Sequence, residues 1–88
     1  MMKLQRFRKA TLREKIKMLK EEGSNITTRA TENYYVRLFT LQGTYVEVWS
    51  SSHIPWQEVV KVKVLDDFYL LKPYLPTVFF AQQTQKSA

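Results

Sequence analysis

Cysteine is absent from these 88 residues, and the chain has a single histidine, His53. Without cysteine the chain forms no disulfide and offers no thiolate ligand to a metal. One histidine also excludes a histidine-based metal cluster within one chain. We therefore expect neither a metal nor a cofactor. A cysteine-free chain fits a reducing compartment, and we predict a cytoplasmic location.

Long apolar runs and glycine-rich loops are absent too. No stretch approaches the ~18 apolar residues that cross a membrane, and the basic start lacks the apolar core of a signal peptide. Gly23 and Gly43 are the only two glycines, too few for a phosphate-binding glycine-rich loop. We therefore expect no membrane partner and no nucleotide-binding loop.

The length limits the size of the core. A chain of 88 residues makes one small domain, which buries roughly 60–65% of its unfolded surface. Neither a disulfide nor a metal is available to support so small a core, and association with a second copy is the remaining support. The sequence therefore predicts a homodimer.

Positive charge is concentrated at the N-terminus. The net charge is +6, whereas residues 1–20 alone carry eight basic residues and one acidic residue. We predict a basic arm over 1–10, a single domain over 11–80 and a disordered tail over 81–88. The alternative for the charged residues is a solvated arm and helix face. Six basic side chains are candidate phosphate contacts: Arg6, Arg8, Lys9, Arg13, Lys17 and Lys20.

A helix is predicted over 12–22. Thr11 and Glu14 have the spacing of a capping box, in which each side chain bonds the backbone N–H of the other residue. Gly23 stands where a left-handed residue would end the helix. The apolar stripe consists of three residues at helical spacing: Leu12, Ile16 and Leu19.

The stretch 34–50 predicts a β-hairpin. A three-residue loop, Leu41-Gln42-Gly43, would place Gly43 in the left-handed region and pair Arg37 with Glu47. One face of this hairpin is then aliphatic: Val36, Leu38, Val46 and Val48. A two-residue turn through Gln42 and Gly43 is rejected, because it shifts the pairing by one residue and mixes the two faces.

Three further elements complete the predicted fold. Residues 26–30 favour a short edge strand, and residues 57–65 alternate with period two. In the second strand, Val60, Val62 and Val64 extend the aliphatic face. Asp66-Asp67 offers an N-cap to a short helix over 68–72. The fold class is therefore α+β: an N-terminal helix packed on a three- or four-stranded antiparallel meander, with a short C-terminal helix.

The other face of the hairpin carries aromatic and charged side chains. Left bare, its four rings would form a larger patch than soluble monomers usually expose. The segment 68–80, a second copy of the chain or a ligand would have to cover it. The candidate binding residues on this face are Tyr35, Arg37, Phe39, Tyr45, Glu47, Trp49, Lys61 and Lys63.

Catalytic groups are few, and we predict that the chain is not an enzyme. His53 lies in a loop next to Ser50-Ser51-Ser52, but neighbours in a loop do not make a nucleophile–base–orienter arrangement. Asp66 and Asp67 more often cap a helix than hold a cation when no further oxygen ligands are near.

Four short stretches carry a resemblance to other proteins. They are Ala10-Thr11-Leu12-Arg13-Glu14-Lys15, Glu22-Gly23, Tyr45-Val46-Glu47-Val48-Trp49 and Lys72-Pro73-Tyr74-Leu75. Together and in this order, the chain resembles a group of short uncharacterised bacterial proteins over nearly its full length. The resemblance implies a stand-alone small domain and carries no activity.

The sequence thus favours a small binding module. The first hypothesis is a protein-interaction or regulatory module that self-associates through the aromatic face or a strand edge. The alternative is a nucleic-acid-binding module that uses the basic arm and helix.

Overall fold

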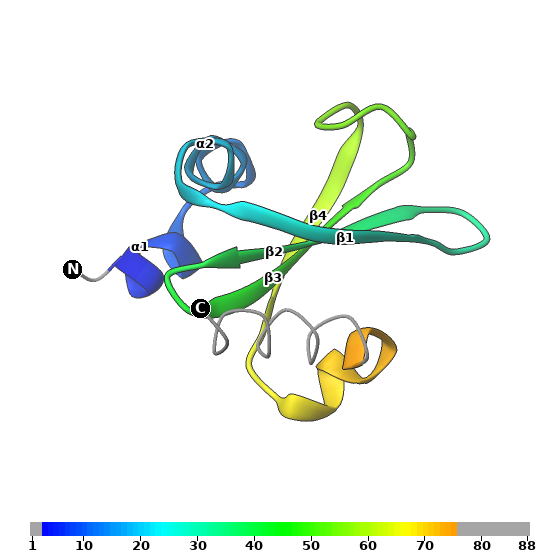
Figure 1. Ribbon diagram of the computed structural model, residues 1–88. Coiled ribbons are helices and arrows are strands. Elements are labelled where there is room, and N and C mark those ends of the chain that lie inside the picture. The colour runs from blue at the N-terminus through cyan, green and yellow to red at the C-terminus, as the bar shows by residue number, and fades with distance from the viewer. Residues whose placement is uncertain (1–2, 76–88) are drawn as a thin grey trace.

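The computed structural model describes residues 3–75 and has seven elements. Two helices, α1 (Lys3–Lys9) and α2 (Leu12–Glu22), precede four strands: β1 (Ser24–Ala30), β2 (Tyr35–Leu41), β3 (Thr44–Ser50) and β4 (Val59–Leu65). A 3-10 helix, η1 (Phe68–Tyr74), follows. The strands form one antiparallel sheet in the order β1-β2-β3-β4 (Figure 1). The predicted α+β meander is confirmed, and the predicted tail over 81–88 lies outside the described residues.

Helix α2 has the predicted boundaries and the predicted capping box. The Glu14 backbone N–H donates to the Thr11 hydroxyl at 3.2 Å, and the Thr11 backbone N–H donates to the Glu14 carboxylate at 3.1 Å. The predicted left-handed cap at Gly23 is wrong, because Gly23 is extended with a φ of −84°. Glycine is required there for space, since a Cβ would lie 2.8 Å from the Leu19 carbonyl oxygen.

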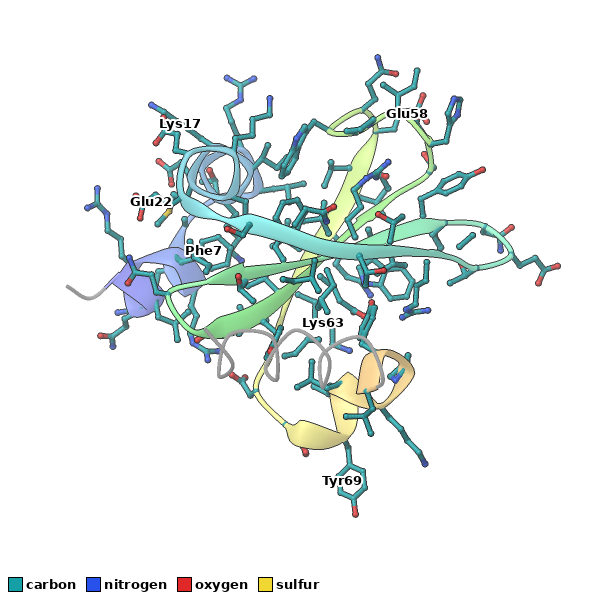
Figure 2. The ribbon with its side chains drawn as sticks, viewed as in Figure 1. Phe7, Lys17, Glu22, Glu58, Lys63 and Tyr69 are labelled. Carbon is teal, nitrogen blue, oxygen red and sulfur yellow. The ribbon has the colours of Figure 1, made fainter. Side chains whose placement is uncertain are left out.

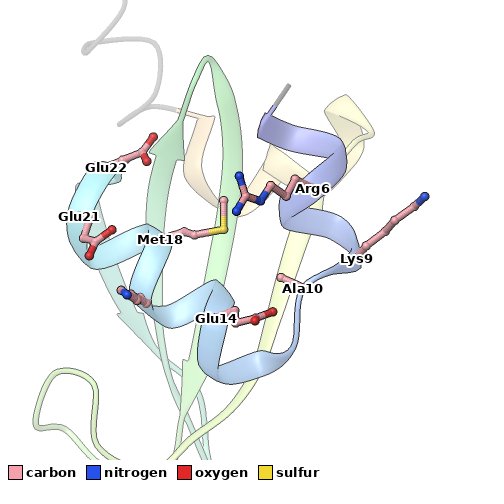
Figure 3. A pocket seen from close by; sticks show the side chains of 8 residues that line it. Arg6, Lys9, Ala10, Glu14, Met18, Glu21 and Glu22 are labelled. Atoms are coloured by element: carbon pink, nitrogen blue, oxygen red, sulfur yellow. The ribbon is translucent and has the colours of Figure 1, made fainter. Parts of the chain in front are cut away.

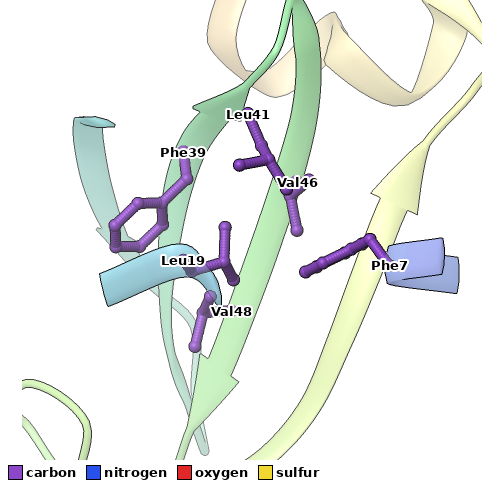
Figure 4. Close-up of a cluster of buried hydrophobic side chains, with 6 residues drawn as sticks. All are labelled: Phe7, Leu19, Phe39, Leu41, Val46 and Val48. Carbon is purple, nitrogen blue, oxygen red and sulfur yellow. The ribbon is translucent and has the colours of Figure 1, made fainter. Parts of the chain in front are cut away.

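Residues 3–9 form α1, whereas the sequence predicted an arm outside the domain. Phe7 is completely buried and points from α1 toward the sheet (Figures 2 and 4). A seven-residue helix is not stable alone in water. The helix therefore depends on the burial of Phe7, which contributes roughly 1.5–3 kcal/mol.

The turn between β2 and β3 has two residues, and this corrects the predicted register. Gln42 and Gly43 have φ angles of 52° and 81°, as a type I′ turn requires. Arg37 therefore pairs with Val48, one residue away from the predicted partner Glu47. The two-residue turn does mix charged and apolar side chains on each face. The fold tolerates this because both buried charges find hydrogen-bond partners, as described below.

One face of the sheet, called here the helical face, packs against α1 and α2. Its core combines side chains from sheet and helices (Figure 4): Phe39, Leu41, Val46, Val48, Phe7 and Leu19. The predicted aliphatic face is thus split, because Val36 and Leu38 point to the other side. The predicted stripe of α2 is only partly buried: Leu19 is 1% exposed, whereas Leu12 is 39% exposed.

The opposite face, called here the C-terminal face, packs against η1 (Figure 1). Leu38 and Leu65 of the sheet contact Leu71 and Tyr74 of η1. The predicted capping of a short helix in this segment is confirmed, since the Asp67 carboxylate accepts from the Tyr69 backbone N–H at 2.9 Å. The described part of the segment 68–80 therefore covers part of this face of the sheet.

A bulge changes which valines of β4 are buried. Ser50 pairs with Val59 and Trp49 pairs with Lys61, so Val60 is left over and is 51% exposed. Val62 and Val64 pack on the helical face as predicted, and Val59 takes the place predicted for Val60. Over residues 3–75, no helix has the length and hydropathy needed to cross a membrane.

Candidate functional site

The eight residues predicted to share one binding face are divided between both faces. Tyr35, Arg37 and Phe39 lie on the helical face, where Phe39 is 5% exposed and belongs to the core. The other five lie on the C-terminal face: Tyr45, Glu47, Trp49, Lys61 and Lys63. The single aromatic face was wrong because the register is shifted by one residue, which moves alternate side chains to opposite sides.

Glu47 is buried on the C-terminal face, and its carboxylate accepts hydrogen bonds from three side chains. One oxygen accepts from the Tyr74 hydroxyl at 2.6 Å and from the Arg29 guanidinium at 3.2 Å. The other oxygen accepts from the Trp49 indole N–H at 2.9 Å. Arg29 also donates through Nε to the Tyr74 oxygen at 2.9 Å. These bonds tie η1 to β1 and β3.

Aromatic rings enclose the guanidinium of this network. Its central carbon lies 5.7 Å from the ring centre of Trp49 and 5.2 Å from that of Tyr74. Burial raises the pKa of the Tyr74 hydroxyl above its usual range, and the hydrogen bond to Glu47 raises it further, against an opposing effect of Arg29. Tyr74 therefore stays a neutral donor to Glu47. We interpret this hydrogen-bond network, called here the lock, as the set of contacts that holds η1 against the sheet.

Arg37 is buried on the helical face without an acidic partner. It is 9% exposed, and its guanidinium donates to the Ser50 hydroxyl at 3.2 Å and to the His53 carbonyl at 2.7 Å. All eight acidic side chains of the sequence fall within residues 3–75, and none comes within 4.0 Å of Arg37. A buried charge that meets only neutral acceptors costs stability. Arg37 is therefore unlike Arg29, which has Glu47.

The loop 51–58 between β3 and β4 is closed at its base. Ser51 donates its backbone N–H to the Glu58 carbonyl at 3.1 Å and its hydroxyl to the Glu58 carboxylate at 2.7 Å. Trp56 and Glu58 have φ angles of 69° and 53°, which cost L residues roughly 1–2 kcal/mol each. The Trp56 ring packs on Phe39 with 5.2 Å between ring centres. The loop is thus held in a strained conformation that presents Trp56.

A pocket of about 320 Å³, called here the Arg37 pocket, lies between the end of α2 and this loop. The Lys20 ammonium at its wall is 5.6 Å from the Trp56 ring centre. The wall contains two cations, two aromatic rings and no acidic residue: Leu19, Lys20, Gly23, Asn25, Arg37, Phe39, Pro55 and Trp56. The pocket is therefore cationic with partly apolar walls.

The predicted phosphate-contact residues fall into three groups. Arg8 forms an exposed ion pair with Asp66, and its hydrogen bond holds the pKa of that carboxyl below the usual range. Arg6 and Lys9 line a cavity of about 580 Å³ between α1 and α2 (Figure 3). Three carboxylates of α2 share that cavity, which makes it a poor site for phosphate: Glu14, Glu21 and Glu22.

The third group, called here the α2 basic flank, consists of Arg13, Lys17 and Lys20. They recur at intervals of four and three residues and are exposed, so they follow one side of α2. Lys17 lies on the outer side of α2 (Figure 2) and also lines the cavity between α1 and α2. Among the residues that the structure describes, no carboxylate lies within 4.0 Å of these three cations. Lys20 joins the flank to the Arg37 pocket.

The catalytic candidates of the sequence are not brought together. The His53 ring meets Tyr35 edge-on at 6.2 Å between centres, and the side chain is exposed. The Ser50 hydroxyl donates to the Ser52 carbonyl at 3.0 Å and accepts from Arg37. Asp66 is paired with Arg8, and Asp67 caps η1. Within 3–75, no three His, Asp or Glu side chains gather around a common point.

Sequence reasoning missed three residues that shape these sites. Arg29 and Tyr74 form the lock around Glu47, and Trp56 forms a wall of the Arg37 pocket. The Pro55-Trp56 step in a serine-rich loop was the available signal for Trp56. Arg29 and Tyr74 are 45 residues apart, and no local pattern joins them.

Comparisons of the chain with protein family models, with curated proteins and with solved structures find no match.

Proposed function

We propose that the protein is a small non-enzymatic binding module for single-stranded nucleic acid, contacted through the α2 basic flank. The observation that carries this proposal is the row of three exposed cations along one side of α2. Among the described residues, no carboxylate lies within 4.0 Å of Arg13, Lys17 or Lys20, although Lys17 also lines the cavity that the glutamates of α2 share. A row of cations on one helix side is an electrostatic footprint for a phosphate backbone, and contact with the phosphates releases counterions.

Trp56 favours a single strand over a duplex as the partner. Its ring lies beside Lys20, at the point where the flank meets the loop 51–58. Unpaired bases stack on aromatic rings, each stack being worth about 1–3 kcal/mol, whereas bases inside a duplex present only their edges. A cation row next to one aromatic ring therefore fits a strand whose bases are accessible.

Salt dependence of oligonucleotide binding tests the proposal. Fluorescence anisotropy with a labelled single strand gives the slope of log affinity against log salt concentration. Replacing Arg13, Lys17 and Lys20 together by Gln is expected to lower the magnitude of this slope by about 2, at about 0.7 per lost phosphate contact. Trp56→Ala is expected to lower affinity at every salt concentration and leave the slope unchanged.

The matched control removes three exposed cations elsewhere. Lys61, Lys63 and Lys72 lie on β4 and η1, away from the flank. Their joint replacement by Gln makes the same change in net charge and is expected to leave the slope within error. Equal effects of both triple variants, or no binding at low salt, would contradict the proposal.

Self-association through a strand edge is the second candidate function. Strand β1 has seven residues and stands at one end of the sheet order, and no other strand within residues 3–75 pairs with its outer edge. Such edges pair with another chain unless charges block them. Thr28→Lys on β1 is then expected to convert a dimer into a monomer in sedimentation velocity, whereas Val60→Lys on β4 leaves the dimer intact. A monomeric wild type would remove this candidate.

A further inference from the structure

We propose that the Arg37 pocket binds a small aromatic carboxylate, whose carboxylate pairs with Arg37 and whose ring lies against Trp56. This site is separate from the α2 basic flank in its chemistry, although Lys20 belongs to both. It does not depend on the nucleic-acid proposal. The inference rests on three observations: the environment of Arg37, the composition of the pocket wall and the fixed position of Trp56.

The first observation is the unbalanced charge of Arg37. A guanidinium has five N–H donors. Hydrogen bonds to the Ser50 hydroxyl and the His53 carbonyl account for two of them among the described residues. Both acceptors are neutral, and no carboxylate of residues 3–75 lies within 4.0 Å. The remaining donors and the positive charge are thus left for a group that enters from the pocket, which Arg37 lines.

The same sheet contains the contrasting case. Arg29 is partly exposed and still has Glu47 and the Tyr74 hydroxyl as partners. Arg37 is more deeply buried and has neither an acid nor an ion pair. A planar carboxylate matches the guanidinium fork with two parallel hydrogen bonds, which makes it the anion that this geometry favours.

The second and third observations concern the body of the ligand. Apart from its two cations, most residues of the wall are apolar or aromatic. Leu19 and Phe39 are almost completely buried, so Trp56, which packs on Phe39 with 5.2 Å between ring centres, and Pro55 provide the exposed apolar surface. The volume of about 320 Å³ lies at the small end of ligand pockets. The Ser51–Glu58 hydrogen bonds and the packing of Trp56 on Phe39 hold the loop in place despite the positive φ angles of Trp56 and Glu58, and such strain often accompanies binding sites. A flat apolar ring suits these walls.

Titration of the full chain with benzoate, benzamide and phenyl phosphate tests the assignment. The readout is the indole N–H signal of Trp56 in two-dimensional ¹H–¹⁵N NMR spectra. Trp49 is the internal reference, because its indole donates to Glu47 on the opposite face. Benzoate is expected to shift the Trp56 signal with saturation and to leave Trp49 unmoved. Benzamide, which has the same shape without the charge, is expected to shift neither.

Variants of Arg37 and of a surface arginine distinguish specific binding of the carboxylate in the pocket from weak binding to any exposed positive charge. Arg37→Met removes the charge and is expected to weaken benzoate binding at least about tenfold, the size expected for a lost charge-assisted hydrogen bond. Arg8→Met removes the same charge from an ion pair on α1 and is expected to change nothing. Arg37→Lys keeps the charge without the fork. It is expected to weaken binding even where Arg37→Met does not fold.

Several outcomes would overturn the proposal. These are equal binding of benzoate and benzamide, unchanged benzoate binding in Arg37→Lys, or equal shifts at Trp49 and Trp56. Phenyl phosphate binding without benzoate binding would overturn the carboxylate assignment. These tests change only Arg37 and Arg8, and neither residue belongs to the α2 basic flank, although Lys20 and Trp56 are shared by the two sites. Failure here is therefore distinguishable from failure of nucleic-acid binding.

Discussion

Two charged side chains at the centre of the sheet have opposite surroundings. Glu47 on β3 receives hydrogen bonds from a tyrosine, an arginine and an indole, whereas Arg37 on β2 meets a hydroxyl and a backbone carbonyl. Removing a buried ion that has several hydrogen-bond partners leaves those partners unsatisfied, which costs stability. At the scale of residues, Glu47 therefore holds the fold together, while Arg37 is available to a ligand.

Removing Glu47 is expected to destabilise the protein strongly. Glu47→Ala leaves the Tyr74 hydroxyl, the Arg29 guanidinium and the Trp49 indole without their acceptor. We expect a loss of about 2–3 kcal/mol in the free energy of unfolding, below the ~3–5 kcal/mol of a fully buried pair because Arg29 is partly exposed. Urea denaturation measures this, with exposed Glu21→Ala as the control. Equal midpoints would contradict the role given to Glu47.

Tyr74 is expected to make stability depend on alkaline pH. Its folded pKa is raised by burial and by Glu47, above an unfolded value near 10. The resulting stability is fully present below the unfolded pKa and is lost as the pH rises from there through the folded pKa. The free energy of unfolding should therefore fall more steeply above pH ~10 in wild type than in Tyr74→Phe. Parallel curves would rule out this linkage.

Among the elements, those with strong local signals were predictable from the sequence. The capping box and periodic apolar residues gave α2 its boundaries, and alternating valines located β4. Helix α1 was not predicted, because it has only seven residues and depends on the packing of Phe7 against the sheet. The hairpin register was not predicted, because separating apolar from charged side chains favoured a three-residue loop. In the structure, the positive φ angles of Gln42 and Gly43 form a two-residue turn instead.

Phe7 is expected to control whether α1 docks. Phe7→Ala should lower the free energy of unfolding by about 3–5 kcal/mol, the usual cost of emptying a buried phenylalanine site. Gln5→Ala on the exposed side of α1 is the control. Thermal unfolding followed by circular dichroism measures both. A wild-type midpoint in Phe7→Ala would mean that residues 3–9 are an arm after all.

The type I′ turn offers a stabilising substitution. Gln42 adopts a φ of 52°, which costs ordinary L residues roughly 1–2 kcal/mol, and asparagine tolerates this region better. Gln42→Asn is therefore expected to recover a fraction of that cost in the free energy of unfolding. Gly43→Ala should do the reverse, because of its φ of 81°, although a Cβ would meet nothing within 4 Å. Destabilisation by Gln42→Asn would argue for the three-residue loop.

At the scale of the whole molecule, the sequence indicated which residues carry charge but not which residues lie beside them in the fold. Lys17 and Lys20 were candidates for phosphate contact, and they lie on the α2 basic flank. The Arg37 pocket combines Lys20, Arg37 and Trp56 from three distant parts of the chain. These three residues come together only because of the register of β2 and the conformation of the loop 51–58, and tertiary packing determines both.

Both the Arg37 pocket and the hydrogen-bond network of Glu47 depend on Arg37 and Glu47 lying on opposite faces of the sheet. Nuclear Overhauser spectra of the labelled protein test this arrangement most directly. We expect backbone cross-peaks between Arg37 and Val48, and side-chain cross-peaks from Glu47 to Tyr74. Backbone cross-peaks that pair Arg37 with Glu47 would restore the three-residue loop and contradict both the lock and the pocket.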